Sequence, residues 1–318
     1  MPALSFQGKV ALAAAAFCLL PFSTTLASAQ KIIAAIPIPN ATDVAINPVT
    51  ELAYIPSGSA VAIVSEKTNT VLGYALIESA YGPEEVAVNP LTNRLYVTTS
   101  QALYVVDTTT NLVVATVNVP AVGVAVNIAT NKIYVSDFES NVYVIDGKTN
   151  NLLKDIQFPE GVENLAVNPV TNRIYVAEDL FPGKVGVING ATDTILTTVN
   201  AGGDLTFSVG VDYVHNLVYT ADQLGTVSVI DGKTNTLKTT ITTGGQPGYV
   251  SVDSLRNRVY VDNTGNGLSA IQVINGANDK IINTVSIPGG PNYSDIDPYR
   301  SRLYVTTLGP DVYVLKTN

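Results

Sequence analysis

Residues 168–179, NPVTNRIYVAED, carry the pattern that decides the fold. The stretch begins with turn-forming residues, continues as alternating apolar residues around Tyr175, and ends in two acids, Glu178 and Asp179. Similar text, NPLTNRLYVTTS, begins at Asn89. A stretch that recurs along a chain indicates a repeated structural unit rather than a single active site.

The tyrosine of this stretch marks seven repeats, spaced by 42, 38, 41, 44, 41 and 44 residues. These tyrosines are Tyr54, Tyr96, Tyr134, Tyr175, Tyr219, Tyr260 and Tyr304. Each repeat reads as four short strands rich in Val, Ile, Thr and Tyr, separated by turns rich in Gly, Pro, Asn and Asp. In the fourth repeat the strands are NLAVN, NRIYVAE, KVGVIN and TILTTVNA. Four antiparallel strands per repeat predict an all-β, seven-bladed β-propeller.

The two ends of the chain predict how this ring closes. The seventh repeat ends at VYVLKTN and lacks a fourth strand, whereas residues 31–37 resemble the fourth strand of the sixth repeat. An open array would leave two unpaired sheet edges. We therefore expect residues 31–37 to complete the last blade. No window has a clear 3.6-residue period, so we expect almost no helix.

Most of the repeated residues have structural explanations. Asn168 can accept a hydrogen bond from the backbone two residues later, and Pro169 presets the backbone of the next turn position. We expect the seven tyrosines to lie in the core and between blades. His215, the only histidine, falls in the turn DYVHN. We expect it at the surface, which argues against a Ser-His-Asp triad.

Residues 1–29 have the features of a secretory signal: Lys9, the apolar run VALAAAAFCLLPF, and ASA before Gln30. We expect this segment to be removed, and residues 30–318 to form one propeller domain. The product should be secreted or periplasmic and monomeric, with no membrane span or anchor. Cleavage would remove the only Cys and the only Met. That would exclude a disulfide, a thiol nucleophile, covalently attached haem and an iron–sulfur cluster.

The stretches NPVTNRIYVAED, VGVING and LGTVSVIDGKTNTLKTTI resemble the YVTN family of β-propeller repeats. This family occurs in archaeal surface-layer proteins and in secreted YncE-like bacterial proteins. The resemblance covers essentially all of residues 30–318 and implies the propeller fold. It does not imply one function, because the same scaffold serves binding proteins and, in more distant relatives, enzymes and redox subunits.

Strand direction divides the charges between two faces of the ring. The top face carries the loops between the second and third strands and the connections between blades, and the bottom face carries the NPxTN and DGKTN turns. The top collects 15 acids against one base, Lys184, a formal charge of −14; the bottom has 11 acids and 15 bases, or +4. Such polarity would steer a cation or a basic partner to the top. The full-chain charge of −9 makes nucleic acid an unfavoured partner.

The innermost strands place polar residues around one end of the expected central channel. Asp295 occupies a position where the other repeats have Ala, Gly or Ser. Two residues earlier in each strand, where the YVTN pattern often has Gly, several repeats have acidic, amide or phenolic residues. We call the resulting candidate binding site the channel mouth; it comprises Asp43, Glu85, Glu163, Asn164, Tyr249, Tyr293 and Asp295.

The channel mouth suits two kinds of ligand. Oxygen atoms from Asp43, Glu85, Asn164 and Asp295 would suit Ca²⁺ or another divalent cation. Tyr249 and Tyr293 could instead form the walls around a cationic or hydroxylated small molecule.

The sequence favours a secreted, non-catalytic binding or scaffold protein that recognises a protein, a cation or a small molecule through its acidic top face. Whether the chain is an enzyme stays open. One alternative is a metal-dependent, lactonase-like hydrolase with a hard cation at the channel mouth. Lesser alternatives are an accessory subunit of a periplasmic redox system and binding of single-stranded DNA. The last needs a basic groove with exposed aromatic residues, and the bottom face has no obvious ones.

Overall fold

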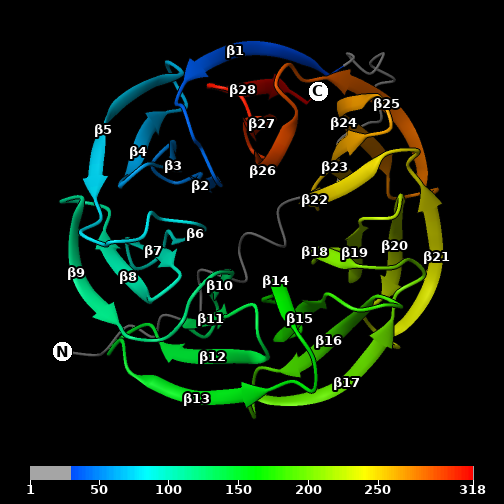
Figure 1. Cartoon of the computed structure of the whole chain (residues 1–318), viewed down its shortest axis with the longest axis horizontal. Helices are drawn as coiled ribbons and strands as arrows, with labels where there is room; N and C mark the ends of the chain where they lie inside the picture. Colours follow the sequence, from blue (N-terminus) through cyan, green and yellow to red (C-terminus); the bar gives the residue numbers. More distant parts are fainter. Residues whose placement is uncertain (1–29, 318) are drawn as a thin grey trace, which may run out of the picture.

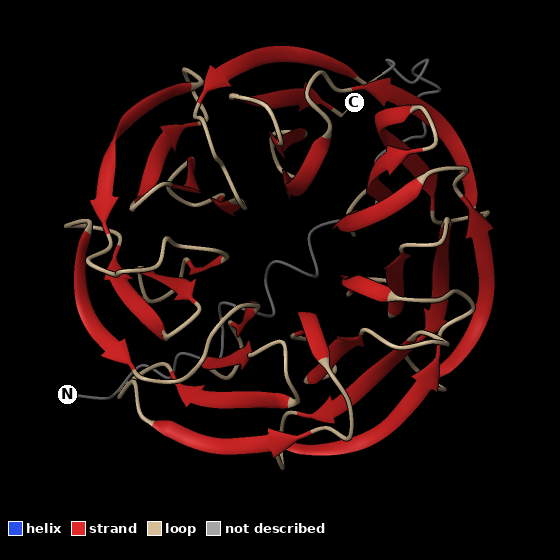
Figure 2. Cartoon of the chain, viewed as in Figure 1, coloured by secondary structure: helices blue, strands red, loops and turns tan. Residues whose placement is uncertain are grey.

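The computed structural model describes residues 30–317. The predicted signal segment, residues 1–29, lies outside the described residues, as does residue 318. The described chain forms seven four-stranded antiparallel sheets, arranged as blades around a common axis (Figure 1). Figure 2 shows strands and loops throughout this part of the chain, without a helix. The predicted all-β, seven-bladed propeller is confirmed, and no described residue belongs to a helix that could cross a membrane.

The blades are numbered along the chain, and the first strand of each lies nearest the axis (Figure 1). Blade 1 contains β2 (Ala45–Asn47), β3 (Leu52–Ser57), β4 (Ala60–Ser65) and β5 (Thr70–Leu76). Blade 2 contains β6 (Val86–Asn89), β7 (Arg94–Thr99), β8 (Ala102–Asp107) and β9 (Leu112–Val117). Blade 3 contains β10 (Val124–Asn127), β11 (Lys132–Ser136), β12 (Asn141–Asp146) and β13 (Leu152–Gln157).

The remaining blades repeat this order. Blade 4 contains β14 (Val162–Asn168), β15 (Arg173–Glu178), β16 (Lys184–Asn189) and β17 (Thr194–Asn200). Blade 5 contains β18 (Thr206–Asp212), β19 (Leu217–Asp222), β20 (Thr226–Asp231) and β21 (Thr236–Thr242). Blade 6 contains β22 (Gln246–Asp253), β23 (Arg258–Gly265), β24 (Leu268–Asn275) and β25 (Lys280–Ser286). Blade 7 contains β26 (Pro291–Asp297), β27 (Arg302–Thr307), β28 (Asp311–Lys316) and β1 (Lys31–Pro37).

Blade 7 joins the two ends of the described chain. β1 pairs antiparallel with β28, from Lys31 opposite Lys316 to Pro37 opposite Asp311. The side chain of Ile36 is only 2% exposed and belongs to the hydrophobic core shared with blade 1. The predicted closure by residues 31–37 is therefore confirmed, and the closing strand also packs against the neighbouring blade.

The seven repeat tyrosines pack between blades, as predicted. Each is at most 1% exposed and lies in a core cluster with residues of the next blade. Two of their hydroxyl groups donate hydrogen bonds to the turn between the third and fourth strands of the next blade. Tyr134 Oη donates to Asp193 Oδ1 at 3.2 Å, and Tyr304 Oη donates to Asn69 Oδ1 at 3.1 Å. Each tyrosine therefore fastens its own blade to the next.

The NPxTN turns add a second link between blades. Within blade 4, Val170 N donates to Asn168 Oδ1 at 3.0 Å, as the sequence predicts. Asn172 ends the same turn at a φ of 52°, in the left-handed region that Asn tolerates. Asn168 Nδ2 also donates to Asn216 Oδ1 of blade 5 at 2.9 Å. The same amide contact joins blade 2 to blade 3 and blade 3 to blade 4, and this second role was not predicted.

We predict that the closing strand stabilises the whole ring through its buried side. Ile36→Ala should lower the free energy of unfolding by about 2–5 kcal/mol, because it leaves a cavity in a shared core. Ile33→Ala on the same strand is the matched control: Ile33 is 40% exposed, and the change should stay within about 0.5 kcal/mol. Urea unfolding measures both values. Equal effects of the two substitutions would contradict this account of closure.

Candidate binding site at the top of the ring

Three of the four acidic residues of the channel mouth, all except Glu163, fasten neighbouring inner strands together. Each accepts a backbone N–H from the next blade around the ring. The contacts are Asp43 Oδ2 with Val86 N at 2.8 Å, Glu85 Oε2 with Val124 N at 3.3 Å, and Asp295 Oδ2 with Ile46 N at 2.8 Å. These carboxyls therefore have a structural role that the sequence did not reveal.

Polar side chains of blades 4 and 5 continue the same series of links. Asn164 Oδ1 accepts from Val209 N at 3.4 Å, and Asn164 Nδ2 donates to Glu85 Oε2 at 3.4 Å. Ser208 Oγ accepts from Val250 N at 3.4 Å. The structure thus brings Asn164 and Glu85, two of the predicted site residues, into contact.

The two phenols of the channel mouth form a pair. The ring centroids of Tyr249, on β22, and Tyr293, on β26, lie 4.8 Å apart with the rings tilted by 48°. Burial and the nearby carboxyls of Asp43 and Glu85 raise the pKa of both phenols well above the ordinary value. Both side chains are therefore neutral near pH 7 and present hydroxyl groups and ring surfaces together.

The carboxyls of the channel mouth hold protons more tightly than ordinary acids. Burial raises the pKa of Glu85 to about 8 and that of Asp295 to about 7. Burial, with the charge of Asp179, raises the pKa of Glu163 to about 8. Burial and the charge of Glu85 raise the pKa of Asp43 well above its ordinary value. Much of this site is therefore uncharged at neutral pH.

The formal charge of −14 overstates the field of the top face. Six of its 15 acids are buried, namely Asp43, Glu85, Asp137, Glu178, Asp222 and Asp262. Burial raises the pKa of most of these carboxyls, so they carry less charge at pH 7 than the formal count assigns. Glu78, Glu139 and Glu160 are exposed and supply the solvated part of the acidity.

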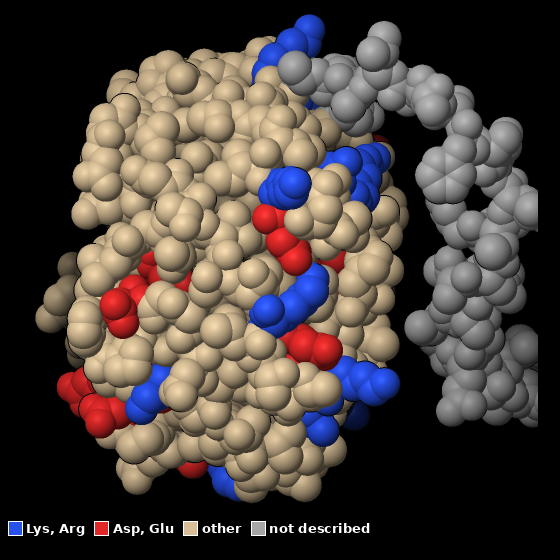
Figure 3. Space-filling view, turned by 90° about the vertical axis from the view of Figure 1, so that its right-hand side faces the viewer, with Lys and Arg blue, Asp and Glu red and all other residues tan. Residues whose placement is uncertain are grey.

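The bottom face carries 15 basic side chains, and five of them form ion pairs: Arg94, Lys132, Lys238, Arg256 and Arg300. Figure 3 views one side of the ring, where most Lys and Arg side chains lie toward the right-hand edge and acids lie toward both edges. All ion pairs found within residues 30–317 belong to the bottom turns and strand ends. Arg300 illustrates them: it contacts Asp297 at 2.7 Å and Glu51 at 2.8 Å, and donates to Pro48 O of blade 1 at 3.0 Å.

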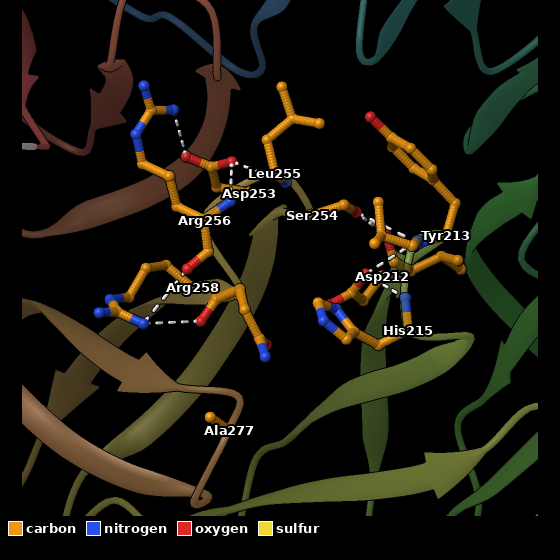
Figure 4. Close-up of polar contacts among 12 residues, drawn as sticks. Asp212, Tyr213, His215, Asp253, Ser254, Leu255, Arg256, Arg258 and Ala277 are labelled. Carbon is orange, nitrogen blue, oxygen red and sulfur yellow. Dashed lines mark hydrogen bonds and ion pairs between the residues drawn. The ribbon is translucent and has the colours of Figure 1, made fainter. Parts of the chain in front are cut away.

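His215 lies in one of these bottom turns and is exposed, as predicted. Its side chain is 43% exposed, and Nδ1 lies 2.8 Å from Asp212 Oδ2 (Figure 4). Arg256 pairs with Asp253 in the same way in the adjacent turn. The expectation that this face lacks an exposed aromatic residue was wrong at one position, because Tyr299 is 69% exposed.

Two pockets flank Tyr293 on the top face. The first, of about 220 Å³, we call the Glu85 pocket; it is lined by Thr42, Glu84, Glu85, Val122, Phe138, Asn292 and Tyr293. The second, of about 210 Å³, we call the Asp262 pocket; its lining includes Phe207, Gln223, Gln246, Asp262, Asn292 and Tyr293. The channel mouth predicted from sequence therefore includes residues of the first pocket but missed most of the second.

A signal for the second pocket was present in the repeats. Asp262 stands two residues after the repeat tyrosine, and the other six repeats have Pro56, Thr98, Ser136, Ala177, Ala221 and Thr306 there. It is the only charged residue at this position. The strand pattern alone did not distinguish it from the other acids of the top face.

The hard cation predicted for Asp43, Glu85, Asn164 and Asp295 stays a prediction. Oxygen donors are the right chemistry for such an ion, and the four side chains lie around one end of the inner strands. In each side chain, however, one of these oxygens already accepts a backbone N–H from the next blade. A cation would have to share these oxygens with the links that join the blades.

Comparisons with known proteins support the fold. A chain of the "Kuenenia stuttgartiensis Hydrazine Synthase" structure matches with a TM-score of 0.77 and 16% identity, over 88% of this chain and 96% of that one. A chain of "Crystal Structure of Mitotic Checkpoint Complex" matches with a TM-score of 0.79 and 11% identity, over 94% and 98%. No family model and no curated protein matches the sequence. The resemblance to the YVTN family stays a prediction.

We predict that Glu85 makes stability depend on pH. Its pKa rises from 4.5 to about 8 on folding, so the folded state holds a proton that the unfolded state releases between these values. This contribution is complete below pH 4.5 and is lost as the pH rises through about 8. Glu85→Gln should therefore raise the melting temperature at pH 9 relative to the wild type and change it little at pH 4.

The exposed Glu160→Gln is the control, with little effect expected at either pH. Calorimetry at pH 4 and pH 9 measures the melting temperatures of the wild type and of both variants. Equal shifts of the Glu85 variant at pH 4 and pH 9 would refute the assignment of a retained proton.

Proposed function

We propose that this protein is a non-catalytic binding protein whose ligand occupies the top face beside the channel mouth. The ligand is a small molecule with hydroxyl or cationic groups. The observation that carries the proposal is the convergence of two pockets on Tyr293, which pairs with Tyr249 at 4.8 Å. Aromatic walls with a few converging polar groups are the usual composition of a small-molecule site.

The arrangement of polar groups also favours binding over catalysis. The carboxyls nearest the phenols accept backbone N–H groups of the next blade and so help to hold the blades together. The one histidine lies on the opposite face, paired with Asp212. Covalent catalysis needs a nucleophile at hydrogen-bond distance from a base, and the channel-mouth contacts within residues 30–317 include no such pair. In the neighbouring pocket the Ser294 hydroxyl donates to Asp262 Oδ1 at 2.9 Å, but both residues are only 2% exposed. The similar chain from a mitotic checkpoint complex fits the general use of this fold as a binding scaffold.

A thermal-shift screen tests the proposal directly. Neutral hydroxylated compounds and small organic cations are added to the full protein, and stabilising compounds are re-tested on two variants. We expect Tyr293→Ala to abolish the shift, because it removes a wall shared by both pockets. Tyr299→Ala makes the same truncation on the bottom face, and this variant should keep the thermal shift. Stabilising compounds that are insensitive to Tyr293→Ala would show that the site lies elsewhere.

A metal titration separates binding from the hydrolase alternative. The chelator-treated protein is titrated with Ca²⁺, Mg²⁺ and Zn²⁺ in a calorimeter. We expect no saturable heat of metal binding, because the oxygens predicted to hold the ion already accept N–H groups and several carboxyls hold protons. Saturable binding that disappears in Asp295→Ala would instead favour a metal-dependent hydrolase and justify a screen of lactones and esters.

A further inference from the structure

Three blades build the Asp262 pocket on the top face. Phe207 comes from β18, Asp262 from β23, and Asn292 and Tyr293 from β26, three strands of neighbouring blades (Figure 1). The residues are separated by up to 86 positions in the chain. Only the ring brings them together, so this pocket exists only in the assembled propeller.

Asp262 has one carboxyl oxygen that the described protein does not satisfy. The residue is 2% exposed, and Oδ1 accepts a hydrogen bond from Ser294 Oγ at 2.9 Å. Oδ2 is buried and has no hydrogen-bond partner within residues 30–317. Other buried atoms in residues 30–317 also lack a partner, among them hydroxyl groups of several repeat tyrosines, but Asp262 in addition lines a pocket. A missing ligand is one explanation for such an atom.

At two equivalent positions in other blades a hydroxyl group makes the link to the next blade that Asp262 Oδ1 makes through Ser294. Thr98 Oγ1 donates to Val122 O at 2.6 Å, and Ser136 Oγ donates to Glu163 O, each reaching the next blade. An aspartate at this position is not needed for such a link, since a hydroxyl group makes it with fewer polar atoms to bury. The extra oxygen of Asp262 therefore calls for an explanation outside the packing of the ring.

The lining of the pocket narrows the chemistry of its ligand. Neutral donors and acceptors come from Gln223, Gln246, Asn292 and Thr264. The lining contains no Lys, Arg or His, which disfavours an anion. It also contains a single carboxyl among amide groups, whereas a cation site gathers several acidic oxygens. Burial raises the pKa of Asp262 to about 8, in keeping with an uncharged ligand at neutral pH.

We propose that the Asp262 pocket binds one ring of a neutral polyhydroxylated molecule, a monosaccharide or the terminal sugar of a glycan, with a ligand hydroxyl on Asp262 Oδ2. This inference rests on the proposed function and names the ligand class for one of its two pockets. Tyr293 and Phe207 supply apolar surface for the C–H groups of the sugar ring, and the amides pair with its hydroxyl groups. A volume of about 210 Å³ is below the roughly 300–1,000 Å³ of drug-sized sites, which suits one ring rather than several.

Calorimetric titration of the full protein with a panel of monosaccharides and their methyl glycosides tests the inference. At least one sugar should bind saturably. Asp262→Ala should raise its dissociation constant about tenfold, the loss expected for one hydrogen bond to a buried group. Asp262→Asn should retain most of the affinity, because it keeps an acceptor for Ser294 and a polar group in the pocket. Binding of the free sugar but not of its glycosides would identify a monosaccharide rather than the end of a glycan.

Two further variants keep the result interpretable. Gln246→Ala alters an exposed residue of the pocket and should weaken sugar binding even if Asp262→Ala folds poorly. Tyr299→Ala, on the bottom face and outside both pockets, should leave sugar affinity unchanged. Choline serves as a cationic probe of the proposed function. Choline binding that needs Tyr293, with no sugar bound, would overturn the sugar inference and leave the proposed function intact. If neither probe binds in a Tyr293-dependent way, both fail.

Discussion

A four-stranded blade cannot bury both of its faces alone, and the rest of this structure depends on that constraint. Each repeat tyrosine lies in a core shared with the following blade, so the seventh tyrosine, Tyr304, needs the first blade as its partner. The ring must therefore close for the last core to form. Pairing of β1 with β28 provides the closure and gives blade 7 its fourth strand, with β1 covering the edge that β28 would otherwise expose.

The same constraint explains why acidic side chains lie so deep in the top face. Inner strands of neighbouring blades converge near the axis, and their backbone N–H groups there have no strand on the other side to pair with. Asp43, Glu85 and Asp295 fill this need by accepting N–H groups across the gap between blades. Burial then raises the pKa of each carboxyl, which links the assembly of the ring to pH and weakens the negative field of the face.

The sequence was sufficient to predict the fold because strands and turns form from local residue preferences, and the number of repeats gives the number of blades. The period of the tyrosines, the alternation within strands and the turn preferences of Asn and Pro set seven blades and their closure. It was insufficient for contacts across blades. The amide contact of Asn168 with Asn216 spans 48 positions and depends on the angle between blades, which no local pattern encodes. The burial of Asp262 could not be predicted for a similar reason. Strand direction assigns this residue to the top face but does not show that its Oδ2 is enclosed.

The contrast between the two faces supports the proposal that the ligand binds at the top. On the bottom, Arg300 is shared among Asp297, Glu51 and a carbonyl of blade 1, so its hydrogen-bonding capacity is used inside the ring. A partner that binds Arg300 would have to replace contacts that hold blades together. On the top, Oδ2 of Asp262 is enclosed without a partner in the described chain, beside an aromatic pair and three side-chain amides. A ligand hydroxyl would add a hydrogen bond there without breaking one, and this asymmetry favours binding at the top over the bottom.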